Sequence, residues 1–388
     1  MKKLILIIMP LFLFLSIQIK AVASNEQDLN IVSKAAILID SKSGAVLFEK
    51  NAQKKMYPAS LTKIATAIYA IEKGNLDEMV TVSEESVQVD GTRVYLNPGE
   101  QVPLRKLVQG MLINSGNDAA HAIADHLHGD IETFSDHLNQ FLKAEVGVNH
   151  THFTNPHGLF DKKHYTTAYD LALITNYALK SPDFKEIFGT KELPWQGKSW
   201  DTTIYTHHRL LKGEIPFEGI TGGKTGFVNE SRQTLATTAH NEQIELTAVV
   251  LKADFKNDIY KDTMTLLDYG YTHYRTSSLE KDTEYRHGDE KFVLEKDTIV
   301  TVPIEGPILN VSAAGELFIQ NDHEVIIQTI PLTPLVKEEA VVAKAEPLKE
   351  DGAKGSIARD NSRVYMLITA ALLSVGLVWF ILKRRVYR

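Results

Sequence analysis

The chain has 388 residues, a formal net charge of −7 and no cysteine. Its length allows more than one domain and a large buried core, and its 44% hydrophobic and 23% charged residues are ordinary for a globular protein. The absence of cysteine excludes disulfides, thiolate metal sites and cysteine nucleophiles. The acidic balance argues against nucleic acid as a partner, because a phosphate-binding face needs an excess of basic residues.

Residues 1–23 have the pattern of a secretory signal peptide. Lys2 and Lys3 precede an apolar run over residues 4–17, and Ala21-Val22-Ala23 supplies the small residues of a cleavage site. An uncleaved anchor is the alternative, which this cleavage pattern disfavours. We therefore expect export by a cleaved signal peptide, with the folded part outside the cytoplasm.

Residues 35–113 alternate between hairpin, helix and loop signals. Two apolar runs flank Ser41-Lys42-Ser43-Gly44, which is typical of a β-hairpin. A helix begins close to Ser60, and apolar residues about one turn apart give it one buried face. A loop-rich stretch at residues 81–99 then leads to a second helix over residues 103–113.

Helical patterns dominate residues 118–180, and a strand-like stretch follows at residues 202–211. Residues 234–252 form a second hairpin pattern, and residues 254–274 return to helix. Because strands stand at both ends of this region with helices between them, we expect an α+β domain over residues 30–275. In that domain the first hairpin joins the later strands in one antiparallel sheet.

The remainder of the chain divides by composition. Short strand patterns between turn residues predict a small all-β domain over residues 279–333. Residues 334–363 lose aromatic residues and have the composition of a linker or stalk. Residues 364–382 contain no charge and would span about 28 Å as a helix, close to the bilayer core. The basic tail at residues 383–388 predicts a cytoplasmic C-terminus, so we expect a single-pass, C-terminal transmembrane helix in the cell membrane.

Ser60 and Lys63 form the first motif with chemical meaning. Residues three apart on a helix are neighbours, so the hydroxyl and the amine share one face. Ser60 also lies in the first turn, where unpaired backbone N–H groups and the helix dipole favour negative charge. A serine that becomes an oxyanion beside an amine that takes its proton suits nucleophilic catalysis. Taken alone the motif is a weak signal, and an N-cap serine with a solvated lysine is then the preferred interpretation.

Two further motifs complete a set. Ser115-Gly116-Asn117 lies between two helical segments, and Lys224-Thr225-Gly226 leads toward a predicted strand. The order Ser-x-x-Lys, Ser-x-Asn, Lys-Thr-Gly is the order found in penicillin-binding proteins and class A β-lactamases. From about residue 35 to residue 274 the chain resembles the low-molecular-weight penicillin-binding proteins, and among them the D-alanyl-D-alanine carboxypeptidases. The stretches that carry the resemblance are residues 59–63, 114–120, 153–159 and 222–227.

The resemblance implies a catalytic domain of the penicillin-binding protein/serine β-lactamase type and a role for each motif residue. Ser60 is the nucleophile that forms an acyl-enzyme, and Lys63 is the base that takes its proton. Lys63 then needs a pKa below the usual value of about 10.4, which burial and the neighbouring cation Lys224 would both produce. Ser115 relays a proton toward the leaving amine. Asn117 bonds the substrate amide and positions Lys63.

The resemblance also implies how substrate is held. The backbone N–H groups of Ser60 and Phe227 form an oxyanion hole, and the strand that carries Thr225 pairs with the extended peptide. Arg209 matches a basic residue that helps hold the terminal carboxylate of the substrate. The implied substrate-binding residues are Lys224, Thr225, Gly226, Phe227 and Arg209.

The leading hypothesis is a serine DD-carboxypeptidase that removes the terminal D-alanine from peptidoglycan stem peptides ending in D-Ala-D-Ala. β-Lactams would then be inhibitors that acylate Ser60, and no metal or organic cofactor is needed. Hydrolysis and transfer to an amine acceptor share the acyl-enzyme, so the sequence leaves both open. A β-lactamase is the first alternative, although no Glu-x-x-Leu-Asn loop lies between Ser115 and Lys224. A catalytically silent peptidoglycan-binding or regulatory module is the second.

A zinc hydrolase is the last alternative, prompted by His121, His126 and His128. Zinc peptidases of the common type carry His-Glu-x-x-His on one helix face. This stretch has no glutamate at the required place, so solvated or core histidines are the preferred interpretation.

Overall fold

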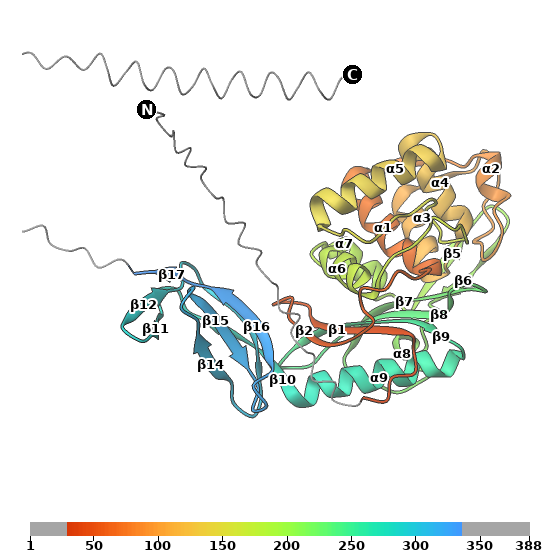
Figure 1. Ribbon diagram of the computed structural model, residues 1–388. Helices are drawn as coiled ribbons and strands as arrows, with labels where there is room; N and C mark the ends of the chain where they lie inside the picture. The colour runs from red at the N-terminus through yellow and green to blue at the C-terminus, as the bar shows by residue number, and fades with distance from the viewer. Residues whose placement is uncertain (1–28, 336–388) are drawn as a thin grey trace, which may run out of the picture. The chain divides into compact units, whose positions relative to one another are not determined.

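The computed structural model describes residues 29–335 (Figure 1). At its centre is a five-stranded antiparallel sheet with the strand order β2-β1-β9-β8-β7. The expected α+β arrangement is confirmed, because the N-terminal hairpin pairs with the later strands through β1 and β9. The strands are β1 (Ala35–Asp40), β2 (Val46–Lys50), β7 (Ile220–Val228), β8 (Arg232–His240) and β9 (Glu245–Ala253).

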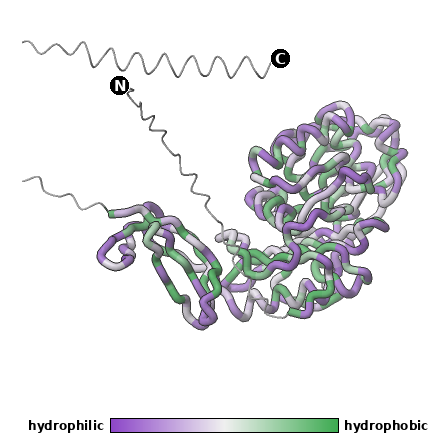
Figure 2. The backbone as a smooth tube through the Cα atoms, viewed as in Figure 1, coloured by the Kyte–Doolittle hydropathy of each residue, from purple (hydrophilic) through white to green (hydrophobic). Residues whose placement is uncertain are grey.

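Both faces of the sheet are covered by helices (Figure 1). The long helix α9 (Lys256–His273) packs on one face, and the remaining larger helices gather on the other. Figure 2 shows hydrophobic residues along the sheet strands between these two layers. On this other face lie α1 (Thr62–Lys73), α3 (Leu104–Ile113), α4 (Asn117–His128), α5 (Ile131–Phe141), α6 (Ala168–Ala178) and α7 (Pro182–Phe188).

Strand β1 shows why the sheet needs two covers. Successive side chains on a strand point to opposite faces, and in β1 both sets are apolar. Ile37 and Ile39 enter the core shared with the helical layer, whereas Leu38 enters the core beneath α9. All three are fully buried, so the strand is hydrophobic throughout rather than alternating.

One predicted strand is wrong in its second half. The expected strand at residues 202–211 ends at Tyr205, because β6 (Asp201–Tyr205) pairs only with β5 (Glu192–Gln196). A short helix, α8 (Arg209–Lys212), follows. The buried imidazole of His208 caps it, since Nδ1 accepts the backbone N–H of Leu211 at 3.1 Å.

The stretch at residues 81–99 contains more regular structure than its loop-rich composition predicts. Strand β3 (Met79–Thr81) pairs with β4 (Gln101–Pro103), and α2 (Glu84–Val87) lies between them. Ser83 caps α2 by accepting the N–H of Ser86 at 3.0 Å. The chain that follows α2 then passes beside the start of α4.

Short strands follow α9. They enclose a small apolar core that includes Phe292, Val300 and Leu317. Strand β10 continues directly from the end of α9, so the division near residue 279 stays a prediction. The strands are β10 (Tyr274–Leu279), β11 (Glu284–His287), β12 (Glu290–Val293), β13 (Thr298–Pro303), β14 (Ile308–Val311), β15 (Glu316–Gln320), β16 (Ile326–Pro331) and β17 (Thr333–Pro334).

The predicted signal peptide, nearly all of the predicted stalk, the predicted membrane helix and the basic tail fall outside residues 29–335. Within those residues, no helix combines the length and the hydropathy that a membrane crossing needs.

One buried carboxylate fastens the chain before α3 to the start of α4. The side-chain oxygens of Asp118 accept the backbone N–H groups of Val94 at 3.0 Å, Leu96 at 3.2 Å and Ala119 at 2.9 Å. Every donor is a backbone N–H, so the site requires a side chain that accepts on both oxygens. Burial raises the pKa of Asp118, and these N–H groups oppose the rise. The carboxylate thereby fixes residues 92–97 beside Asn117.

The substitution Asp118→Asn should lower the free energy of unfolding by about 2 to 4 kcal/mol, because the new amide group faces N–H donors and leaves them unsatisfied. Denaturant unfolding measures the effect. The control Asp136→Asn changes an exposed carboxylate on α5 and should stay within about 0.5 kcal/mol. Equal stability of the two variants would contradict the role given to Asp118.

Candidate active site

The sequence predicts Ser60 in the first turn of an α-helix. In the structure it lies instead in a strained turn before the helix. It occupies the 3-10 turn η1 (Ala59–Leu61), and α1 begins only at Thr62. Ala59 has a φ of 50°, so a regular helix does not extend through it. Its carbonyl presses on Gly158, where an added Cβ would lie 1.9 Å from the oxygen. The strain and this contact fix the backbone that precedes Ser60.

The amine of Lys63 is the centre of the site. Nζ lies 3.0 Å from Ser60 Oγ, 2.6 Å from Asn117 Oδ1 and 3.0 Å from the carbonyl oxygen of His157. The last two atoms only accept hydrogen bonds, so they take the two N–H groups of a neutral amine. The remaining lone pair then faces the hydroxyl of Ser60. The geometry fits a neutral lysine that accepts the serine proton.

Burial favours that neutral form. Lys63 has no exposed surface, and burial lowers its pKa well below the ordinary value. The nearby cation Lys224 lowers the pKa further, whereas the Asp118 carboxylate opposes the effect. The two causes expected from the sequence, burial and a second cation, thus act on this amine in that order.

Ser115 and Lys224 form the opposite wall. Lys224 Nζ donates to Ser115 Oγ at 3.0 Å and to the carbonyl oxygen of Thr225 at 2.9 Å. Burial lowers the pKa of Lys224 to about 7. Ser115 has a φ of 64°, which is uncommon for a residue with a side chain. Among the described residues, no hydrogen bond joins Ser115 to Ser60 or Lys63.

Asn117 is held in a single orientation. Its Nδ2 donates to the carbonyl oxygen of Asp90 at 2.6 Å, so Oδ1 must face Lys63. Its backbone N–H donates to the carbonyl oxygen of Thr92 at 2.7 Å, and Asn114 Nδ2 donates to that of Arg93 at 3.0 Å. The loop fixed by Asp118 therefore also sets the position of Asn117.

Strand β7 forms one edge of the central sheet and passes next to Ser60. A Cβ added to Gly226 would lie 3.0 Å from the backbone nitrogen of Ser60, so a side chain there would crowd the turn. Thr234 on β8 donates to the carbonyl oxygen of Pro58 at 3.0 Å and fastens the turn to the sheet. Phe227 is 53% exposed. The free edge of β7 therefore runs past Ser60, where an extended peptide can pair with it.

Arg209 lies apart from this cluster. Its guanidinium donates to Glu214 at 3.3 Å and to Asn257 at 3.0 Å, and it lies over the ring of Tyr260. It lines a pocket of about 400 Å³ together with Asn114, His207 and other residues. No hydrogen bond in residues 29–335 links Arg209 to Ser60, Lys63, Ser115 or Lys224.

Two contributors were missed by the sequence reasoning. The carbonyl oxygen of His157 holds the amine of Lys63, and a backbone atom leaves no signal in residue type. Asp118 stands inside the motif stretch 114–120 but was given no role. An acidic residue directly after the Ser-x-Asn motif, followed by two alanines at the helix start, is the signal that could have identified it.

The three histidines of α4 take separate partners. His121 lies 3.5 Å from Asp125, His126 lies 3.6 Å from Glu78, and His128 shares a hydrogen bond of 2.8 Å with Tyr69. They do not converge on one point.

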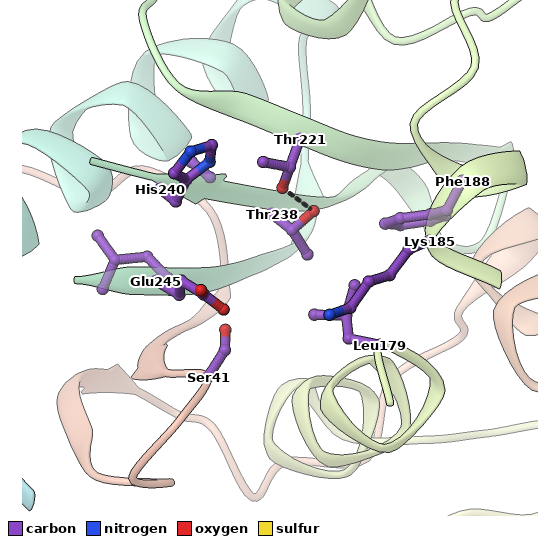
Figure 3. Close-up of a pocket in the computed structure, with 10 residues that line it drawn as sticks. Ser41, Leu179, Lys185, Phe188, Thr221, Thr238, His240 and Glu245 are labelled. Carbon is purple, nitrogen blue, oxygen red and sulfur yellow. Dashed lines mark hydrogen bonds between the residues drawn. The ribbon is translucent and has the colours of Figure 1, made fainter. Parts of the chain in front are cut away.

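A separate pocket of about 190 Å³ lies at the other end of β7 (Figure 3). Thr221 donates to Thr238 across its floor at 2.8 Å. None of the motif residues lines it, so it is distinct from the cluster around Ser60. Its lining residues are Ser41, Leu179, Lys185, Phe188, Thr221, Thr238, Ala239, His240, Glu245 and Leu246.

Known proteins are similar to this chain in sequence over most of their length. Residues 21–255 match the family model described as D-alanyl-D-alanine carboxypeptidase. D-alanyl-D-alanine carboxypeptidase DacF of Bacillus subtilis is 28% identical over 82% of this chain and 87% of its own. DacA of Haemophilus influenzae is 29% identical over 75% of this chain and 77% of its own.

The fold is similar as well. Penicillin-binding protein 5 of Haemophilus influenzae superposes with a TM-score of 0.68 at 25% identity, over 79% of this chain and 97% of that one. DacD of Francisella tularensis gives the same TM-score at 25% identity, over 78% and 93%. With its fold, its motif order and a family match over more than half of its length, the chain belongs to the D-alanyl-D-alanine carboxypeptidase family of serine peptidases.

Proposed function

We propose that Ser60, activated by neutral Lys63, is the nucleophile with which this serine DD-carboxypeptidase removes the terminal D-alanine from peptidoglycan stem peptides. The observation that carries the proposal is the set of contacts around Lys63 Nζ. Two oxygens that can only accept take its N–H groups, and its third neighbour is Ser60 Oγ. A base in hydrogen-bond reach of its nucleophile is the arrangement that covalent catalysis requires.

The acylation step follows from this geometry. Lys63 takes the hydroxyl proton of Ser60 as Oγ attacks the carbonyl carbon of the peptide bond. The negative charge that forms on the carbonyl oxygen is stabilised by the backbone N–H groups of Ser60 and Phe227. The C–N bond then breaks and leaves an ester on Ser60. The departing nitrogen takes a proton from the hydroxyl of Ser115, which is hydrogen-bonded to Lys224, and Ser115 in turn receives the proton that Lys63 took from Ser60, so that Lys63 is neutral again.

Deacylation uses the same groups in the second half of the cycle. Water attacks the ester carbonyl while Lys63 takes its proton, and that proton returns to Ser60 Oγ as the ester bond breaks. The shortened stem peptide leaves with a new carboxylate. A β-lactam presents a similar carbonyl, so it acylates the same oxygen.

The substrate pairs with the edge of β7. Its terminal carboxylate lies toward Lys224 and Thr225, because these residues precede Phe227 of the oxyanion hole along β7. It also lies toward Arg209, which lines the adjoining pocket. The amide of Asn117 bonds the peptide from the other side. Arg209 acts in capture at the pocket it lines rather than in the proton transfer.

The place of action follows from the sequence alone. The signal peptide at residues 1–23 supports export, and residues 364–382 with the basic tail support a single-pass anchor. The proposed order is a catalytic domain at residues 30–275, a small β-domain at 279–333, a stalk at 334–363 and a transmembrane helix at 364–382. The catalytic domain then faces the cell wall.

The substitutions Ser60→Ala and Lys63→Met should each abolish release of D-alanine from a peptide ending in D-Ala-D-Ala, by at least about 10³-fold in kcat. The matched control Lys73→Met changes the exposed lysine at the other end of α1 and should keep full activity. Release of D-alanine is measured directly, and labelling with a fluorescent penicillin reports acylation. Unchanged labelling of Lys63→Met would refute the role of Lys63 as base.

The pH dependence of kcat/KM should be bell-shaped. Lys63 must be neutral to act as the base. Because its pKa is depressed, kcat/KM should rise with pH well below the usual pKa of a lysine. Lys224 must be charged to attract a carboxylate, and its pKa of about 7 means that substrate capture falls as pH rises above that value.

In Lys224→Arg the cation persists, because a guanidinium stays protonated. Its falling limb should disappear below about pH 9, and an unchanged falling limb would contradict the assignment to Lys224.

A further inference from the structure

A third pocket, of about 280 Å³, opens beside the turn that carries Ser60 and is lined by three lysines. Lys55 and Lys162 come from two loops, and Lys252 comes from β9. The remaining lining residues are Met56, Tyr57 and Tyr165. No acidic side chain lines this lysine pocket, although the whole chain carries a net charge of −7.

Two backbone features bring the lysines together. A bridge between Met56 and Thr166, with hydrogen bonds of 2.7 and 2.9 Å, places the loop of Lys55 beside the loop of Lys162. An irregularity in the pairing of β8 with β9 falls at Lys252, which has a φ of 60°. A bulged residue of this kind turns its side chain out of the regular alternation.

The positive charge of this pocket is not compensated. Within residues 29–335, none of Lys55, Lys162 and Lys252 forms an ion pair. The nearest acidic neighbour in sequence, Asp161, accepts the backbone N–H of Lys163 at 2.6 Å. Lys55 lies 4.0 Å above the ring of Tyr165, which fixes its direction without neutralising it.

Lys252 of the lysine pocket lies at nearly the same position along the sheet as Phe227 on β7, whose N–H belongs to the proposed oxyanion hole. Gln233 on β8 pairs with Phe227 on one side and with Ala253 on the other, so the neighbouring Lys252 lies two strands from the oxyanion position. Two strand spacings are about 10 Å, and a peptide on the free edge of β7 lies one further spacing away. Tyr57, which lines the pocket, meets the ring of Phe160 edge to face at 5.0 Å.

The pocket also lies on the acyl side of the scissile bond. A peptide antiparallel to β7 places its terminal D-alanine toward Lys224, at the earlier part of the strand. The residues that precede the scissile bond therefore extend toward the end of β7 at Val228. A side chain two or three residues before the terminal D-alanine reaches about 10 Å from the reacting carbonyl.

We propose that the lysine pocket binds carboxylate groups on the acyl portion of the stem peptide, so that the enzyme selects acidic stem peptides. This inference rests on the proposed function at Ser60. The ligand class is an acidic peptide, because three uncompensated ammonium groups attract carboxylates and two tyrosines line the same pocket.

The test compares two peptides ending in D-Ala-D-Ala that differ in one group. One carries a free carboxylate on the side chain two residues before the terminal D-alanine, and the other carries a carboxamide there. For the full-length protein we expect kcat/KM to be roughly tenfold higher with the carboxylate peptide and the preference to shrink at high salt. Equal kcat/KM for both peptides would overturn the proposal while leaving the function intact.

Variants locate the preference. Lys162→Glu reverses the charge of an exposed loop residue, so folding is not at risk, and Lys162→Gln with Lys252→Gln removes two of the three charges. Each should lower kcat/KM for the carboxylate peptide and leave the carboxamide peptide unchanged. The control Lys281→Gln, at an exposed site after β10, should keep the full preference.

Acylation by a penicillin without an acidic side chain separates the possible failures. Normal acylation of the lysine variants shows that their catalytic groups are intact, and a retained carboxylate preference in those variants would then refute the pocket. If the unmodified protein releases D-alanine from neither peptide, the proposed function itself fails.

Discussion

The site depends on one buried amine. Lys63 lies in the core with no exposed surface, and burial disfavours the protonated, charged form of an amine. Two acceptor oxygens, from Asn117 and from the His157 carbonyl, contact the amine, and Ser60 Oγ, the proposed nucleophile, is its third neighbour. Lys224 is a second buried amine, and burial disfavours its charged form too. Its pKa of about 7, against 10.5 in water, corresponds to about 5 kcal/mol of disfavour for the charged form.

Each layer of the fold contributes one wall around that amine. The sheet edge β7 supplies Lys224 and the backbone beside Ser60. The helical layer supplies the turn that carries Ser60 and the start of α4 with Asn117. The positive φ angles of Ala59 and Ser115 show that the chain accepts local strain at both positions. Close packing against Gly158 and the bonds of Asp118 hold this strained geometry in place.

The sequence was a good guide where spacing or composition determines structure. The two hairpins, the helix at residues 103–113 and the antiparallel sheet were predicted from alternation and turn residues, and the motif order led to the family. The strand at residues 202–211 was overextended because the apolar pattern continues through Leu210 and Leu211, which belong to a helix capped by His208. Ser60 was placed in an α-helix because residue type does not reveal the φ of Ala59.

Other features of the site could not be predicted because they depend on backbone atoms or on distant residues. The His157 carbonyl has no signature in the side chain. Lys55, Lys162 and Lys252 are separated by long stretches of chain, and only an isolated bridge and a strand irregularity unite them. Such contacts arise from tertiary structure, and no local pattern contains them.

The most direct measurement is the pH dependence of Ser60 acylation by a fluorescent penicillin in the unmodified protein and in Lys224→Met. The account holds that neutral Lys63 is the base and that Lys224 lowers its pKa. Removal of the Lys224 charge should therefore raise the pKa of Lys63 and move the rising limb of acylation to higher pH. A rising limb at the same pH in both proteins would contradict the account.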